Sequence, residues 1–278
     1  ALNDSKKNIR NIDLFAATCG PGLIGPLLVG STFVKSLSIG CKKPFVPINH
    51  IEGHVLSPTY NNTITYPHIS ILLTGGHTQI YLVTKAREIL LLGESVDDAV
   101  GETFDKIAKI LNLDYPGGPE IEKHAQNGND FLYKLPIPKL KDNSLNMSFS
   151  GIKTAIRLLV NKNEIKDKFV SDICASFQKC ISQILLERLS KSIIYLKNKS
   201  IDVKSISVVG GVSNNEYIKN NISNYVKDKN IDIFFPIKEM MSDNAAMIAW
   251  AGINKDKKSE NIYFKTNPRM VISQKDSI

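Results

Sequence analysis

The stretch Ser70-Ile-Leu-Leu-Thr-Gly75-Gly76-His77-Thr78 runs from an apolar strand directly into two glycines and a polar turn. In the second half of the chain, Ser207-Val-Val-Gly210-Gly211-Val-Ser213-Asn214 has the same design. Two related lobes would each supply one such turn, but two glycines after a strand are also a common turn. The residues alone leave both interpretations open.

Around these two stretches, strand-like runs alternate with longer helical patterns, which predicts an α/β fold. The predicted strands are 14–18, 45–48, 69–73, 80–83 and 205–209, and the predicted helices are 97–111, 152–160, 172–197, 215–227 and 244–253. The segment 115–146 between the two halves is rich in Pro, Gly and Asn.

The composition is that of a globular protein. The 278 residues are 42% hydrophobic and 22% charged, and 35 Lys and Arg against 27 Asp and Glu give a formal net charge of +8. This length suffices for one large domain or two lobes. The charge permits an anionic partner such as nucleic acid without requiring one, because most of the cations are lysines. The four cysteines form no Cys-x-x-Cys pair, which favours free thiols in a reducing compartment.

The uncharged stretch 14–34 is long enough for a membrane span, but two prolines and four glycines interrupt it. It therefore predicts a strand, a tight turn and a small-residue helix packed inside the protein. Within it, Gly20-Pro-Gly-Leu-Ile-Gly25 matches G-x-G-x-x-G. No Asp or Glu lies between Asp13 and Glu52 to bind a ribose, which disfavours a dinucleotide site. The start of the chain shows no secretory signal.

Asn49-His50-Ile-Glu52-Gly-His54 places two imidazoles four residues apart, so that on a helix they share one face and can bind one metal ion. Glu52 follows the first His by two residues instead of one, which disfavours the general base of a metalloprotease. A hard oxygen donor would complete an open iron(II) or zinc site. Asp243 is the best candidate for it, or alternatively it is the N-cap of the helix that begins there.

The Gly-Gly turns offer backbone N–H groups where no side chain obstructs a phosphate, and the second turn leads into a helix N-terminus that favours anions. These features predict a nucleotide site. Asp105 and the turn Pro116-Gly-Gly-Pro119 are candidates for the sugar or the other end of such a ligand, although each alone is typical of an exposed carboxylate or a loop. Ser148 and Ser150 open a helix and predict an N-cap, and no base is identified that would make Ser150 a nucleophile.

Several motifs, in this order and spacing, resemble the TsaD/Kae1/Qri7 family of tRNA threonylcarbamoyladenosine transferases over nearly the whole chain. They are Gly20-Pro-Gly-Leu-Ile-Gly25, Asn49-His-Ile-Glu-Gly-His54, Leu73-Thr-Gly-Gly-His77, Asp97-Asp-Ala-Val-Gly-Glu-Thr-Phe-Asp105, Tyr115-Pro-Gly-Gly-Pro119, Phe149-Ser-Gly-Ile-Lys-Thr154, Gly210-Gly-Val-Ser-Asn-Asn215 and Ser242-Asp-Asn-Ala-Ala-Met247.

The resemblance implies an actin-like (ASKHA) fold of two related lobes around a central cleft. The expected lobes are 1–115 and 116–278, with the final segment packing back on the first lobe. The family's metal ligands match His50, His54 and Asp243, which implies one divalent metal per subunit, with iron(II) favoured over zinc. The positions that match contacts to threonylcarbamoyl-adenylate or a nucleotide are Leu73, Thr74, Gly75, Gly76, His77, Asp105, Gly118, Glu122 and Asn215. Family members often carry Asp at the position of Glu122.

The reaction that the resemblance implies moves a threonylcarbamoyl group from threonylcarbamoyl-AMP to N6 of the adenosine 3′ of the anticodon in tRNAs that read ANN codons. The expected partners are tRNA, a TsaB-like homologous subunit and a TsaE-like ATPase, or a second copy of the chain if it is mitochondrial. No membrane association is expected, and the expected compartment is the cytoplasm.

One difference from the family concerns the N-terminus. Family members begin with a strand hairpin that carries a phosphate motif and then a helix, and no counterpart precedes the strand at 14–18. We therefore expect either a fragment or an eroded gene, with unpaired sheet edges. The alternatives are an ASKHA nucleotide-binding protein that is catalytically degenerate, or an ASKHA nucleotide hydrolase or sugar kinase, which would not need the His pair.

Overall fold

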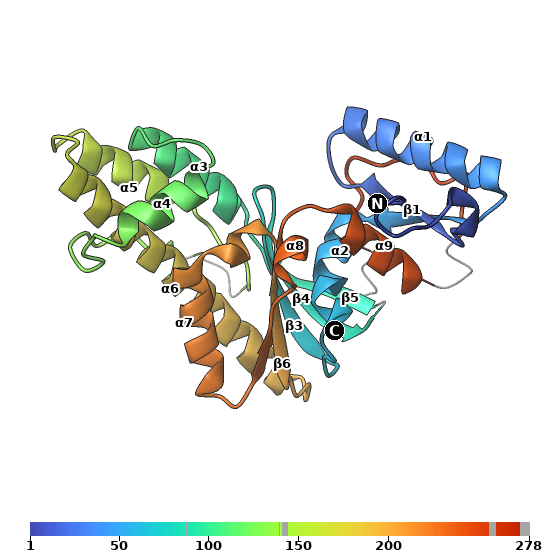
Figure 1. Ribbon diagram of the computed structural model, residues 1–278. Coiled ribbons are helices and arrows are strands. Elements are labelled where there is room, and N and C mark those ends of the chain that lie inside the picture. Colours follow the sequence, from blue (N-terminus) through green and yellow to red (C-terminus); the bar gives the residue numbers. More distant parts are fainter. Residues whose placement is uncertain (87, 139, 141–143, 256–259, 273–278) are drawn as a thin grey trace. The chain divides into compact units, whose positions relative to one another are not determined.

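The computed structural model describes residues 1–86, 88–138, 140, 144–255 and 260–272 and divides into two compact units (Figure 1). Unit 1 comprises Ala1–Thr63, Val83–Leu90 and Pro236–Ser277, and unit 2 comprises Ile64–Leu82 and Leu91–Phe235. Each unit is therefore discontinuous in sequence.

Unit 1 is built on a strand-helix-strand arrangement after a short 3₁₀ turn, η1 (Ile9–Asn11). Strands β1 (Phe15–Gly20) and β2 (Phe45–Asn49) pair in parallel, and helix α1 (Ile24–Cys41) connects them. Gly20 has φ of +152°, and a Cβ there would lie 1.9 Å from the carbonyl oxygen of Asn267. Only glycine fits this position, because the C-terminal segment passes directly over the end of β1.

The prediction that α1 is packed inside the protein was wrong, because the helix exposes much of its apolar surface. Only Leu27, Ser31 and Ser38 are buried in it, whereas Val29 is 73% and Phe33 is 64% exposed. Among the described residues it is the one helix whose length and apolar composition would suffice to cross a bilayer, a test that core helices and signal sequences also pass.

The other helices of unit 1 are α2 (His50–Leu56), η2 (Ser57–Tyr60), α8 (Lys238–Met241) and α9 (Ala245–Ile253). Val46 and Ile48 of β2 pack with Leu56 of α2 and with Met247, Ile248 and Ala251 of α9 in a buried cluster. The indole N–H of Trp250 also donates to Thr59 Oγ1 at 2.9 Å. These contacts join the beginning and the end of the chain, and they position α2 against the loop that precedes α9.

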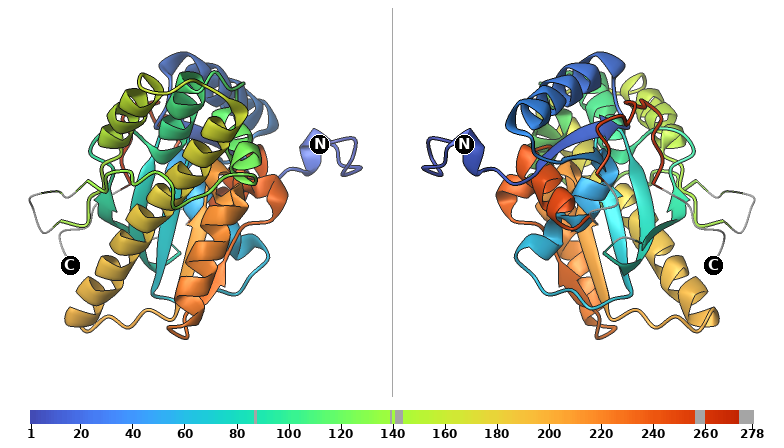
Figure 2. Two further views of the ribbon diagram at one scale, coloured as in Figure 1. Left: turned by 90° about the vertical axis from the view of Figure 1, so that its left-hand side faces the viewer. Right: turned by 90° about the vertical axis from the view of Figure 1, so that its right-hand side faces the viewer.

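Unit 2 contains most of a five-stranded sheet with the order β5-β4-β3-β6-β7. Its strands are β3 (His68–Leu73), β4 (Thr78–Lys85), β5 (Glu88–Glu94), β6 (Ser205–Val209) and β7 (Asp232–Phe234), and the outer ends of β4 and β5 belong to unit 1. β6 pairs in parallel with both β3 and β7. The long helix α6 (Asp167–Asn198) and α7 (Glu216–Lys227) cover one face of this sheet (Figure 2).

Three shorter helices complete unit 2: α3 (Val100–Ile110), α4 (Gly117–Ala125) and α5 (Ser150–Val160). α3 packs against α4 and α5, and α4 packs against α6. The 3₁₀ turn η3 (Gly211–Asn214) connects β6 to α7.

The units divide the chain differently from the expected boundary after residue 115. Residues 64–82 and 91–115 group with the second half of the chain because β3 is hydrogen-bonded to β6. The segment that begins at residue 236 groups with the first half because α9 packs on α2 and β2, which is the direction in which the final segment was expected to pack. The two Gly-Gly turns therefore do not represent one turn per unit. Both follow adjacent strands of a single sheet in unit 2.

The predicted strands and helices all occur, with ends that shift by a few residues, but the strands β5 and β7 and the helices α4 and α8 were missed. Helix α4 begins with Gly117-Gly118-Pro119, and these residue types indicate a turn when they stand alone. Proline is nevertheless tolerated in the first turn of a helix, because the N–H groups there have no partner inside the helix.

His68, at the start of β3, is completely buried, and neither ring nitrogen has a hydrogen-bond partner among the described residues. The Tyr66 ring lies 5.3 Å away, centroid to centroid. Burial lowers the pKa of His68 from 6.5 to about 4, because the charged ring would lose its hydration.

We predict that His68 makes the folded protein sensitive to acid. Unfolded His68 binds a proton below about pH 6.5, but folded His68 binds one only below about pH 4. The free energy of unfolding is therefore not reduced by protonation of this residue above about pH 6.5. It decreases as the pH falls, and at pH 4 it is lower by about 3 kcal/mol. Denaturant unfolding between pH 7 and pH 4 should show that His68→Phe loses less stability than the wild type by this amount. Identical pH profiles would contradict the prediction.

Candidate functional site

The three predicted metal ligands lie together in unit 1. His54 Nε2 is 3.0 Å and His50 Nε2 is 3.4 Å from the same Asp243 oxygen, Oδ1. The two rings meet edge to face with centroids 4.8 Å apart. All three ligand atoms lie within 4.8 Å of one another.

Local structure explains this convergence. His50 and His54 occupy one face of α2, whose first turn is held by Asn49 as the N-cap. Asp243 lies in the turn before α9, and the N-cap of α9 is Asn244, whose Oδ1 accepts the N–H of Met247 at 2.8 Å. Asp243 therefore does not cap the helix, and its carboxylate is directed at the imidazoles instead.

The donor set fits a divalent cation. Two imidazole nitrogens and one carboxylate oxygen match the ligands that zinc and iron(II) accept in open sites. His54 is completely buried, and its Nδ1 has no hydrogen-bond partner among the described residues, whereas Asp243 is 76% exposed. Hydrogen bonds from His50 and His54 hold the pKa of Asp243 well below its usual range, so this oxygen stays ionised and able to bind a cation.

Glu52 is turned away from these ligands. It is 6% exposed, and its carboxylate forms an ion pair with Lys255 at 2.6 Å. A buried, paired carboxylate is not available to activate a water molecule. This geometry agrees with the sequence argument against a metalloprotease.

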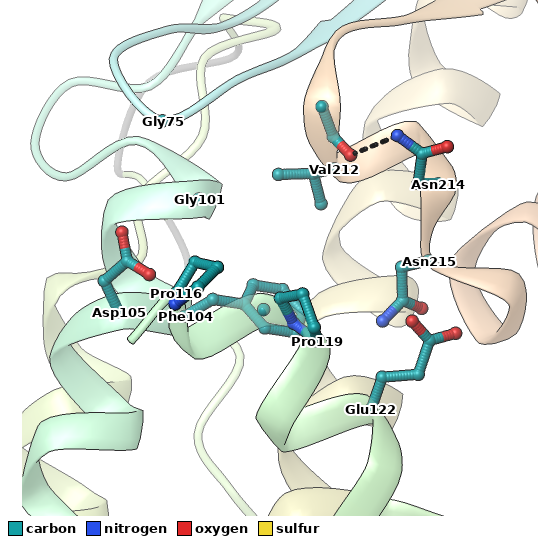
Figure 3. Close-up of a pocket in the computed structure, with 12 residues that line it drawn as sticks. Gly75, Gly101, Phe104, Asp105, Pro116, Pro119, Glu122, Val212, Asn214 and Asn215 are labelled. Carbon is teal, nitrogen blue, oxygen red and sulfur yellow. Dashed lines mark hydrogen bonds between the residues drawn. The ribbon is translucent and has the colours of Figure 1, made fainter. Parts of the chain in front are cut away.

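A cavity of about 240 Å³ lies in unit 2, at the edge of the sheet where β3 and β6 end (Figure 3). It is lined by Gly75, Gly101, Phe104, Asp105, Pro116, Gly118, Pro119, Glu122, Gly211, Val212, Asn214 and Asn215. Both Gly-Gly turns thus contribute a glycine to one cavity, and α3 and α4 supply the opposite wall.

Five of the nine predicted ligand-contacting residues line this cavity: Gly75, Asp105, Gly118, Glu122 and Asn215. The other four belong to the first glycine turn and are not among its lining residues: Leu73, Thr74, Gly76 and His77. The side chain of Leu73 is completely buried in the core and is not exposed at the cavity.

Thr74 shapes the first glycine turn. Its Oγ1 accepts the N–H of Gly76 at 3.3 Å and the N–H of His77 at 2.9 Å. Its own N–H donates to the carbonyl of His77 at 2.9 Å. These bonds hold Gly75 at the cavity wall, so Thr74 acts in the structure as a support for the turn.

Two N–H groups in the first turn of α7 are bound by side chains of the protein itself. Glu122 Oε1 accepts the N–H of Glu216 at 2.7 Å, and Asn215 Oδ1 accepts the N–H of Ile218 at 3.0 Å. Two of the N–H groups that this helix N-terminus would offer to an anion are therefore already bound, one by a carboxylate from α4 and one by the N-cap. A phosphate would instead meet the glycines of the two turns.

Sequence reasoning missed Gly101, which permits the close approach of α3 to the first glycine turn. A Cβ at Gly101 would lie 2.8 Å from the Thr74 carbonyl oxygen and 2.9 Å from Gly75 Cα. It also missed the apolar lining by Phe104 and Val212. The spacing in Gly101-Glu-Thr-Phe-Asp105 could have predicted the position of Gly101, since on a helix this residue lies one turn from Asp105 and on the same face.

The sequence predicted that Ser148 or Ser150 caps α5, but neither side chain does so. Both hydroxyls donate to Asp97, and the N–H of Phe149 donates to the same carboxylate at 2.8 Å. Burial raises the pKa of Asp97, but these bonds to the ionised form outweigh it and lower the pKa overall. A carboxylate distant in sequence thus takes the place of a local cap.

Comparison with known proteins identifies the family. The family model described as TsaD, tRNA N6-adenosine threonylcarbamoyltransferase, matches residues 1–250. Relatives with the same name are 44% identical in Rickettsia peacockii (strain Rustic), over 91% of this chain and 75% of the relative, and 40% identical in Wolbachia pipientis wMel, over 93% and 76%. The chain belongs to the TsaD family.

The fold agrees with this membership. The crystal structure of full-length HypF in its phosphate- and nucleotide-bound form aligns with a TM-score of 0.66 at 13% identity, over 91% of this chain and 40% of HypF. At this identity the likeness shows the fold alone, which is the α/β actin-like (ASKHA) fold expected from the sequence. Nothing in these comparisons favours the alternative of a catalytically degenerate copy.

We predict that His50→Ala abolishes stoichiometric metal binding by this TsaD chain. The substitution removes one of two nitrogen donors, which should weaken zinc or iron(II) binding by at least about 100-fold. Metal content measured by mass spectrometry after anaerobic equilibration and gel filtration tests this. His124→Ala, which removes a histidine of α4 outside the cluster, should retain one equivalent. One equivalent in His50→Ala would contradict the assignment.

We also predict that Gly118→Leu fills the cavity without unfolding the protein. A Cβ at Gly118 meets no atom within 4 Å, and the residue lies in the first turn of α4. Leu also has the higher helix propensity, so the melting temperature should not fall. Calorimetry with AMP should show binding weakened at least about tenfold.

The neighbouring glycine provides the control for this substitution. A Cβ at Gly117 would lie 2.6 Å from Ala108 Cβ and 2.8 Å from Asp105 Cα, so Gly117→Ala should instead lower the melting temperature by disturbing the packing of α3 on α4. Unchanged AMP affinity in Gly118→Leu would contradict the placement of a nucleotide in this cavity.

Proposed function

We propose that this chain transfers the threonylcarbamoyl group of threonylcarbamoyl-AMP to N6 of the adenosine 3′ of the anticodon in tRNAs that read ANN codons. The match of the TsaD family model over residues 1–250 carries this proposal. The cavity adds support, because it offers the side-chain chemistry that an adenylate requires.

The cavity provides distinct surfaces for the parts of an adenylate. Phe104 and Val212 offer apolar contact to a base, and the carboxylate of Asp105 is an acceptor for ribose hydroxyls. Asp105 Oδ1 already accepts the N–H of Gly117 at 2.8 Å, which fixes the orientation of the carboxylate and leaves its second oxygen for the ligand. Gly75 and Gly211 carry no side chain to obstruct a phosphate.

The proposed reaction is an acyl transfer to a weak nucleophile. The N6 amine is aromatic, so its lone pair is delocalised into the base, and attack on the carbamoyl carbon depends on accurate positioning. As the N–C bond forms, the bond from that carbon to the phosphate oxygen breaks, the amine loses a proton and AMP leaves. The role of the cavity is to hold the adenylate and to stabilise negative charge on the leaving phosphate.

We propose that His50, His54 and Asp243 hold one divalent metal, with iron(II) favoured and zinc as the alternative. When bound, such a cation supplies Lewis-acid stabilisation of an oxygen that gains negative charge. The buried ring of His54 and the ionised carboxylate of Asp243 orient the donors before the metal arrives.

The proposed partners are tRNA, a TsaB-like homologous subunit and a TsaE-like ATPase in the cytoplasm, or a second copy of the chain in a mitochondrion. The exposed apolar side chains of α1, such as Val29 and Phe33, support a protein partner on unit 1. The net charge of +8 is compatible with tRNA.

Transfer of radiolabelled threonine to tRNA tests the proposed function. Purified chain is supplied with labelled threonylcarbamoyl-AMP, tRNA and the partner subunits, and label that stays with tRNA after acid precipitation is counted. The wild type and His124→Ala should transfer label, and His50→Ala should transfer at least about 100-fold less. No transfer by the wild type would contradict the function, and wild-type transfer by His50→Ala would contradict the metal's role.

A further inference from the structure

Gln178 is a polar side chain in the middle of the long helix α6 and is only 3% exposed. Its Oε1 accepts a hydrogen bond from Nδ2 of Asn215 at 2.6 Å. Asn215 is 6% exposed and lines the cavity, whereas Gln178 is not among the lining residues. Gln178 can therefore influence a ligand in the cavity only through Asn215.

The hydrogen bonds of Asn215 define which way its amide faces. Oδ1 must face the N–H of Ile218, which it accepts at 3.0 Å as the cap of α7. Nδ2 then faces Gln178 and gives it one of its two hydrogens. Because the amide group is planar, the direction of one N–H bond fixes the direction of the other. Figure 3 shows this amide beside the Glu122 carboxylate at the cavity wall.

The position of Gln178 is itself secured by packing. Its neighbour Phe177 is completely buried, and the Phe177 ring meets the Phe104 ring at a centroid distance of 4.8 Å. Phe104 lies on α3, one position before the cavity residue Asp105. Helix α6, which carries Gln178, thus contacts α3 through this pair of rings.

We propose that Gln178 is a positioning residue that directs the second N–H of Asn215 at a hydrogen-bond acceptor of the bound adenylate. This inference rests on the proposed function, since it requires a nucleotide in this cavity. Without Gln178, Oδ1 of Asn215 still caps α7, but Nδ2 loses its fixed partner and the donor is no longer held in one direction.

A purely structural role of the same pair makes a different prediction. If Gln178 only satisfies the buried Nδ2 of Asn215, removing Gln178 lowers the stability of the fold. Any change in nucleotide affinity is then the same whether or not residue 215 carries an N–H donor. A double-mutant cycle distinguishes the two roles, because it measures whether Gln178 acts through Asn215.

The experiment measures AMP affinity by calorimetry, and the melting temperature, for the wild type and five variants. Gln178→Met removes the acceptor while keeping similar volume, and Gln178→Glu keeps an acceptor. Asn215→Asp keeps an oxygen to cap α7 and removes the N–H donor. The double variant Gln178→Met, Asn215→Asp completes the cycle. Ser182→Ala, which changes another buried polar side chain of α6, is the matched control.

We expect Gln178→Met and Asn215→Asp each to weaken AMP binding about tenfold, and the double variant to bind no more weakly than Asn215→Asp alone. Gln178→Glu should remain within about threefold of the wild type, and Ser182→Ala should match it. Because Gln178→Glu retains the acceptor, it provides the comparison if Gln178→Met proves too unstable to purify.

Four outcomes would overturn the inference. Gln178→Met could bind AMP as tightly as the wild type does. Alternatively, Gln178→Met could weaken AMP binding equally in the wild type and in Asn215→Asp. Either result would leave the proposed function intact. Gln178→Glu could lose as much affinity as Gln178→Met, which would separate affinity from the acceptor. A wild type that binds no AMP would overturn the proposed nucleotide site and this inference together, which distinguishes that failure from the others.

Discussion

The parallel pairing of β3 with β6 is the interaction on which the cavity of unit 2 depends. With Leu72 opposite Val209, both strands end at the same edge of the sheet, and the two glycine turns leave it side by side. The approach is so close that a Cβ on Gly210 would lie 2.4 Å from the Leu73 carbonyl oxygen, and Gly210 has φ of +94°. Glycine is required there by both space and backbone conformation.

The wall of the cavity is then held by hydrogen bonds between segments that are distant in sequence. Glu122 from α4 and Asn215 at the start of α7 satisfy first-turn N–H groups of α7, and Gln178 from α6 satisfies the amide of Asn215. Asn215 and Gln178 are buried, and buried polar atoms need partners, so the bonds that satisfy them also orient the amide of Asn215 at the cavity wall. In the candidate metal site of unit 1, the two histidines instead rely on the helical period of α2.

Much of this arrangement follows from local pattern. The four-residue spacing of His50 and His54 predicts one helical face, and the apolar runs before the glycine turns predict strands. Helix α4 could not be predicted, because Gly117, Gly118 and Pro119 indicate a turn unless the packing of α3 and α6 stabilises a helix there. The support of the first turn by Thr74 and the capture of Ser148 and Ser150 by Asp97 also depend on which acceptor lies nearest in space.

The sequence by itself determined the α/β class, the family, the pair of imidazoles and the residue types of both glycine turns, because these follow from short-range periodicity and from motif spacing. The tertiary structure decided that both turns belong to one sheet, that Asp243 faces the imidazoles instead of capping α9, and that the N-terminus of α7 is occupied by Glu122. These outcomes depend on strand pairing and hydrogen bonds between residues that are far apart in the chain, and no local pattern specifies such partners.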